Sequence, residues 1–173
     1  MDHANLVAID THTHAEVSCW NPFDSYGEEY DRAADKYFRN AKRPTIEETI
    51  AYYRERKIGL VMFTVDAESK LGRRRIPNEE IAEAAQKNSD MMICFGSIDP
   101  HKGKMGAREA ERLIKEHGVK GFKFHPTVQG YHPYDKMAWP IEPDHGDGAL
   151  DFQEDVFVRH LVFASAPDYC YKQ

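Results

Sequence analysis

Four short apolar runs, separated by stretches with helical spacing, constrain the fold of this chain more than any other feature. Each run ends at polar or turn-forming residues, as strands buried on both faces of a sheet do. The predicted strands span residues 6–9, 58–65, 91–95 and 119–125. This β-α-β-α-β-α-β order requires a parallel sheet with right-handed crossovers. Both an open doubly wound sheet and part of a barrel fit this order.

The stretches between these runs carry recognisable helix signals. Thr45 opens a T-x-x-E capping box with Glu48, and an apolar stripe follows it. Pro77 stands at a suitable first helical position, and Gly118 is a typical helix stop. We therefore predict helices that begin near residues 45 and 77 and a third that ends near residue 117. Residues 25–38 are also charged and compatible with a helix.

Composition and the absence of certain motifs argue against several classes of protein. The chain has 173 residues, which suits one globular domain. Its formal net charge of −6 gives no cationic footprint for nucleic acid. There is no glycine-rich phosphate loop, no apolar run long enough for a membrane span and no signal-like start, so we expect a cytoplasmic protein without a membrane or nucleic-acid partner. Three cysteines without C-x-x-C spacing are expected to be reduced thiols.

The sharpest chemical signal is the segment Asp10-Thr11-His12-Thr13-His14, which follows the first predicted strand. In extended backbone, residues i and i+2 point the same way, so His12 and His14 can present two imidazoles to one divalent metal. Parallel α/β folds place their sites at this end of a strand. The alternative is a pair of solvated histidines in a polar loop.

The fourth predicted strand offers a second pair with the same spacing. Lys123 and His125 share one face, and Phe122 and Phe124 share the other. His125 is a candidate third ligand, substrate-binding group or base, unless it only hydrogen-bonds the loop beside it. Lys123 either binds an anionic substrate, carries a carbamate that binds metal, or extends to water.

Further polar residues follow the other predicted strands. Asp66 and Asp99 occupy equivalent positions after the second and third strands, as ligands or general bases, or as ordinary turn and helix-capping residues. Other side chains are expected near the mouth of the site or packed on the surface. These are Glu16, Cys19, Trp20, Tyr131, His132 and Tyr134.

With these residues, the chain resembles the amidohydrolase superfamily, in its branch of metal-dependent hydrolases and decarboxylases that includes aminocarboxymuconate-semialdehyde decarboxylase. The segments that carry the likeness are IDTHTHAEV at residues 9–17, FGSIDPHKG at 95–103 and GVKGFKFHPTVQGYHPYDKMAWP at 118–140. The resemblance implies a (β/α)8 TIM barrel and a mononuclear divalent metal, with zinc as the expected ion. It makes His12 and His14 metal ligands and places His125, the candidate catalytic residue, at the substrate. From its position beside His125 we also expect Lys123 to bind the substrate.

The chain departs from that family pattern in its last part. Residues 141–173 carry seven acidic residues against Arg159 and Lys172, and they lose the strand-helix rhythm. The family's later histidine and aspartate motifs have no match. A whole barrel has eight strands and takes about 250 residues, so the four strands predicted here make up half of one. We expect residues 1–140 to be the N-terminal half of such a barrel and residues 141–173 a divergent acidic tail from truncation or a frameshift.

The sequence therefore predicts an α/β fold, a partial TIM barrel of about four parallel strands with an atypical tail. The expected function is that of a metal-dependent hydrolase or non-oxidative carboxy-lyase that acts on a small aromatic or acyl carboxylate or thioester. The alternatives are a catalytically incomplete fragment, or a small α/β binding protein, that needs a partner or a homo-oligomer because two sheet edges are otherwise left open.

Overall fold

The computed structural model describes residues 1–21, 32–33, 35–36, 39, 42–72, 74–132, 135–136 and 162–163. Most of the predicted helix over residues 25–38, the side chain of Tyr134 and nearly all of the acidic tail lie outside the described residues. The predictions made for these segments therefore remain predictions.

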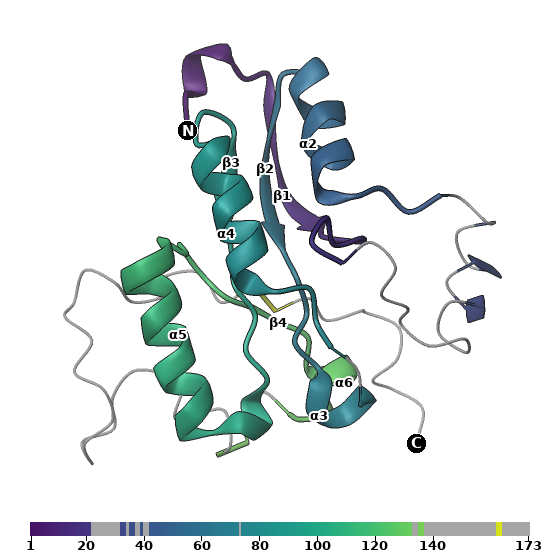
Figure 1. The fold of residues 1–173 in the computed structure, drawn as a ribbon, viewed down its shortest axis with the longest axis vertical. Coiled ribbons are helices and arrows are strands. Elements are labelled where there is room, and N and C mark those ends of the chain that lie inside the picture. Colours follow the sequence, from purple (N-terminus) through teal and green to yellow (C-terminus); the bar gives the residue numbers. More distant parts are fainter. Residues whose placement is uncertain are drawn as a thin grey trace.

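A parallel sheet organises the described part of the chain (Figure 1). Strands β1 (Ala8–His14), β2 (Ile58–Phe63) and β3 (Met92–Cys94) are hydrogen-bonded in that order, and all run in the same direction. Strand β4 (Lys123–Phe124) pairs in parallel with β5 (Val162–Phe163). A single parallel bridge between Gly96 and Phe122 links the end of β3 to the start of β4. The predicted fold class, a parallel β-α alternation that forms part of a TIM barrel, is confirmed.

Three longer helices connect these strands. Helix α2 (Ile46–Glu55) packs on β2, α4 (Asn78–Lys87) packs on β3, and α5 (Lys104–His117) packs on α4. Two one-turn helices, α3 (Glu68–Leu71) and α6 (Pro126–Gln129), lie side by side (Figure 1). The 3₁₀ turns η1 (His3–Asn5) and η2 (Pro100–Lys102) complete the described elements.

The predicted helix ends are largely confirmed. The Thr45 hydroxyl accepts from the Glu48 backbone at 3.1 Å, and the Glu48 carboxylate accepts from the Thr45 backbone at 2.9 Å, which completes the capping box. Gly118 ends α5 with φ of 69°, a conformation that glycine adopts without strain. Pro77 is the N-cap of α4 rather than its first residue. The one-residue shift keeps the proline where its missing N–H costs nothing.

Strand β1 differs from its prediction. The sequence suggests a buried strand at residues 6–9 that ends before Asp10, whereas β1 extends to His14 and is mostly exposed. It continues because Thr13 and His14 still pair with Met62 and Phe63. The strand contains a bulge, since the register advances by three residues on β1 and by two on β2 between Asp10 and Thr13. The two histidines therefore lie on the strand itself.

The core lies between the sheet and the helices. Leu60, Met62 and Phe63 from β2 are completely buried, as is Leu113 from α5. Phe122 and Phe124 belong to the same core, as their predicted shared face requires. Among the described elements β1 pairs only with β2. Within the described part of the chain, no helix combines the length and the apolar character that a bilayer crossing demands.

We predict that Leu113→Ala lowers the free energy of unfolding by about 2–5 kcal/mol, because it leaves a cavity between α5 and the sheet. Met105→Ala on the same helix is the matched control. Met105 is 73% exposed, so its truncation is expected to change stability by no more than about 0.5 kcal/mol. Urea unfolding followed by circular dichroism measures both, and equal losses would contradict the described packing of α5.

Candidate functional site

His12 and His14 converge at the carboxyl end of β1. Their Nε2 atoms are 3.2 Å apart. Both imidazoles lie edge-on to the buried ring of Phe63 at the end of β2, with ring centres 5.2 Å and 4.8 Å away. Two imidazole nitrogens on one tetrahedral zinc ion, each at about 2.0–2.1 Å, would be roughly 3.3 Å apart. The pair therefore has the spacing of two ligands to one metal.

The protonation of this pair also suits metal binding. Burial, reinforced by the neighbouring His12, Lys123 and His125, lowers the pKa of His14 to about 4. Burial and Lys123 also lower the pKa of His12, although Asp10 opposes them. His14 is consequently neutral near pH 7, as an imidazole ligand must be.

Lys123 on β4 is the most unusual side chain near the pair. The residue is fully buried, and its Nζ has no hydrogen-bond partner among the described residues. The amine lies 4.9 Å from the centre of the Phe63 ring. Burial lowers its pKa. The alternative in which this lysine extends to water is wrong, because the strand end is covered in the folded chain.

His125 follows β4 and lines a cavity. Its backbone N–H donates to Gln129 Oε1 at 2.7 Å, and its Nδ1 accepts from the Val128 backbone at 3.4 Å. Burial, followed by Lys123, lowers the pKa of His125. With Nδ1 used as an acceptor, the neutral ring carries its proton on Nε2. His125 is thus arranged as a hydrogen-bond donor, which does not suit metal ligation through the same nitrogen.

A cavity of about 170 Å³ lies beside these residues. Its polar lining consists of His14, Glu16, Thr64, Arg74, Arg75 and His125. Burial raises the pKa of Glu16, against the effect of Arg43. Among the described residues, no three histidine, cysteine or acidic side chains are grouped to hold a metal. His12 and His14 are therefore a two-ligand set, and His125 adds hydrogen-bonding capacity without a third ligand.

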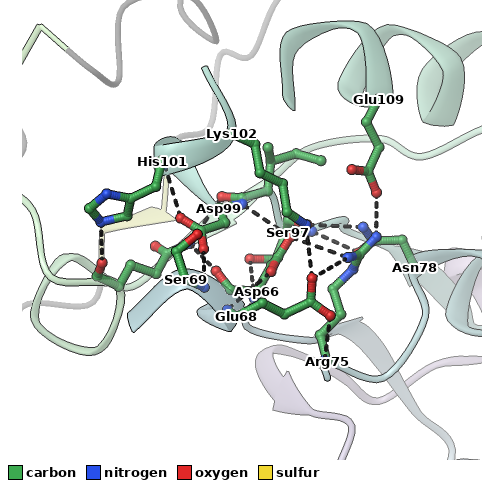
Figure 2. A network of polar contacts seen from close by, with 12 residues as sticks. Asp66, Glu68, Ser69, Arg75, Asn78, Ser97, Asp99, His101, Lys102 and Glu109 are labelled. Atoms are coloured by element: carbon green, nitrogen blue, oxygen red, sulfur yellow. Dashed lines mark hydrogen bonds and ion pairs between the residues drawn. The ribbon is translucent and has the colours of Figure 1, made fainter. Parts of the chain in front are cut away.

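Asp66 and Asp99 belong to a different structure, a polar network at the ends of β2 and β3 (Figure 2). Asp66 Oδ2 accepts from Lys102 Nζ at 2.6 Å and from the Asp99 backbone at 3.1 Å. Asp99 accepts from the Ser69 and His101 backbones at 2.8 Å and 2.9 Å. Both carboxylates are completely buried, and neither lines the cavity. Of the two interpretations for these aspartates, the geometry favours turn formation and capping.

The same network contains residues that sequence reasoning missed. Gln129 is fully buried and donates to the Asp66 and Ile98 carbonyls at 2.8 Å and 3.0 Å, while it accepts from His125. It therefore joins the loops after β2, β3 and β4. The Ser97 hydroxyl donates to the Lys123 carbonyl at 2.8 Å. No local pattern in the sequence indicates these roles. Apart from His125, every hydrogen-bond partner named here lies at least 26 residues away along the chain from Gln129 or Ser97.

Of the described residues that were expected at the mouth of the site, only Glu16 lines the cavity. The backbone N–H groups of Cys19 and Trp20 instead donate to the buried carboxylate of Glu80, another residue that the sequence did not indicate. Tyr131 is packed in the core. The His132 backbone donates to Asp135 at 2.7 Å. Cys19, Trp20, Tyr131 and His132 do not line the cavity.

Comparisons with known proteins show which protein family this sequence matches. The sequence model of the amidohydrolase family matches residues 9–151. A search among curated proteins finds no match. One similar solved structure is a 5-carboxyvanillate decarboxylase from Novosphingobium aromaticivorans with bound manganese and 3-methoxy-4-hydroxy-5-nitrobenzoic acid. It is 17% identical, the match covers 80% of this chain and 47% of that chain, and the TM-score is 0.49.

A second similar structure is a 4-oxalomesaconate hydratase from Rhodopseudomonas palustris. It is 20% identical, with 77% of this chain and 47% of that chain covered and a TM-score of 0.46. This chain thus spans about half the length of both solved structures.

We predict that Lys123→Met raises the free energy of unfolding by about 1–3 kcal/mol at pH 7, because methionine fills similar space and removes a buried amine that has no partner among the described residues. Lys120→Met, at an exposed position on the same segment, is expected to stay within about 0.5 kcal/mol of wild type. Urea unfolding curves of the metal-free proteins provide the measurement. A clear loss of stability in Lys123→Met would mean that the amine is stabilised by a partner.

Proposed function

The chain belongs to the amidohydrolase family, and from this premise we propose that His12 and His14 bind a divalent metal ion for a hydrolase or a non-oxidative carboxy-lyase. The observation that carries the proposal is the 3.2 Å separation of their Nε2 atoms. Zinc is the proposed metal, because it accepts imidazole nitrogen readily in a tetrahedral site. When bound, the metal supplies a Lewis acid that polarises a carbonyl group or activates water.

The remaining site residues have separate proposed roles. Lys123 Nζ, buried and without a partner among the described residues, attracts an anionic group of the substrate. His125 donates a hydrogen bond from Nε2 to a substrate oxygen. This hydrogen bond strengthens as negative charge develops on that oxygen during the reaction. The proposed substrate is a small aromatic or acyl carboxylate or thioester. The fully buried ring of Phe63 excludes water from behind both imidazoles.

The organisation of the whole protein is also a proposal. We propose that residues 1–140 form the half-barrel and that residues 141–173 are a divergent tail from truncation or a frameshift. We also propose that the protein is cytoplasmic, where Cys19 and Cys94 stay free thiols. Only two metal ligands are grouped among the described residues. Val7, which precedes β1, and Ile9 on β1 are 74% and 43% exposed. These observations also suit a second candidate, a catalytically incomplete fragment that needs a homo-oligomer or another partner.

We predict that the purified protein binds about one zinc ion per chain and that His12→Ala/His14→Ala binds none, because the double variant lacks both ligands. His117→Ala, at the end of α5, is the control and is expected to bind like wild type. Elemental analysis after dialysis against zinc or manganese, with the mass in solution measured in parallel, tests metal and assembly together. Metal retained by the double variant would refute the assignment.

We predict that His125→Phe lowers kcat by about 10²–10³-fold at unchanged metal content, the loss typical of removing one oxyanion donor. The measurement is turnover of a panel of aromatic carboxylates and aryl thioesters, together with zinc content. Arg108→Gln, a change at an exposed site on α5, is the control. If His125→Phe loses its metal instead, the residue is a ligand and the proposed role is wrong.

A further inference from the structure

A chain of two hydrogen bonds connects α2 to the backbone of His12. The Tyr53 hydroxyl donates to Asp10 Oδ2 at 2.6 Å. The other carboxylate oxygen, Oδ1, accepts from the His12 backbone N–H at 2.9 Å. Tyr53 and Asp10 are 43 residues apart in the sequence. The contact is therefore tertiary, and it ends on one of the two proposed metal ligands.

This hydrogen-bond chain lies at the irregular point of β1. Asp10 pairs with Leu60 and Thr13 pairs with Met62, so Thr11 and His12 together stand against one residue of β2. A bulge of this kind interrupts the ladder and redirects a side chain. It also leaves a backbone amide without its regular partner, and an unpaired amide is costly unless another acceptor is found. The Asp10 carboxylate is the acceptor for His12.

We propose that Tyr53 and Asp10 are positioning residues for the metal centre, an inference that rests on the proposed metal-binding role of His12 and His14. The Tyr53 hydroxyl fixes the Asp10 carboxylate, and the carboxylate fixes the backbone of the bulge. The imidazole of His12 is thereby held 3.2 Å from that of His14, at Nε2. Without this support the bulge can rearrange, and the two nitrogens lose the spacing that one metal requires.

The helix that carries Tyr53 does not depend on this hydroxyl. Helix α2 is held by its capping box and by the buried side chains of Ile46 and Ile50. Tyr53→Phe removes the hydroxyl and keeps the ring that packs against the core. Its neighbour Tyr52 is 55% exposed, and the Arg56 guanidinium lies over its ring. Tyr52→Phe is therefore a matched control: the same atom is removed one residue away.

The test uses Co²⁺ as the probe, because it binds imidazole sites and its visible absorption reports ligand geometry. We expect Tyr53→Phe and Asp10→Asn to weaken Co²⁺ affinity by about 10–100-fold, the usual effect of losing a residue that orients a ligand, and to change the visible spectrum. Tyr52→Phe is expected to match wild type in both. The metal-free Tm of Tyr53→Phe should stay within about 4 °C of wild type, the upper shift expected for a change of roughly 1 kcal/mol in a chain of this length.

The outcomes separate this inference from the proposed function. If wild type binds Co²⁺, His12→Ala does not, and Tyr53→Phe and Asp10→Asn keep wild-type affinity and spectrum, only the positioning role is overturned. A loss of affinity in Tyr53→Phe that accompanies a larger fall in metal-free Tm, with Asp10→Asn unaffected, also overturns it. If wild type binds no Co²⁺, or His12→Ala binds like wild type, the metal centre itself is refuted, and the positioning role with it.

Discussion

The parallel pairing of β1 with β2 is the constraint on which the candidate site depends. Parallel strands bring their carboxyl ends to one edge, so His14 lies opposite Phe63 in the register. The buried Phe63 ring then supports both imidazoles and lies 4.9 Å from the amine of Lys123, which arrives from β4. An antiparallel arrangement would have sent these side chains to opposite ends of the sheet. The alternation of strands and helices is therefore also what assembles the chemistry.

Much of this alternation could be predicted from the sequence because its signals are local. The capping box of α2, the glycine that ends α5 and the shared core face of Phe122 and Phe124 depend on spacings of a few residues. The H-x-H motif is equally local, and the structure brings His12 and His14 together as that spacing predicts. Their role as ligands, like the roles of Lys123 and His125, stays a prediction that metal analysis must test.

The features that the sequence did not reveal depend on contacts between distant residues. Helical periodicity assigns Tyr53 to the core-facing stripe of α2, but it gives no indication that the hydroxyl reaches Asp10 on another element. The length of β1 was underestimated because Asp10 looks like the polar end of a strand, whereas its carboxylate is satisfied by Tyr53 and by the His12 backbone. Gln129 is similar, since its three hydrogen-bond partners come from three different loops. Pairings of this kind appear only once the fold is known.

Hydrogen-bond satisfaction divides the polar residues at this edge of the sheet into two kinds. Asp66 and Asp99 are buried and accept several hydrogen bonds each, so their free energy of burial is offset within the protein. Lys123 is equally buried, yet its Nζ has no partner among the described residues. A buried cation without a partner is destabilising, and such a group persists where a ligand can satisfy it. By this reasoning the Asp66 network supports the loops around the cavity, and Lys123, His125 and the histidine pair retain the capacity to bind a ligand.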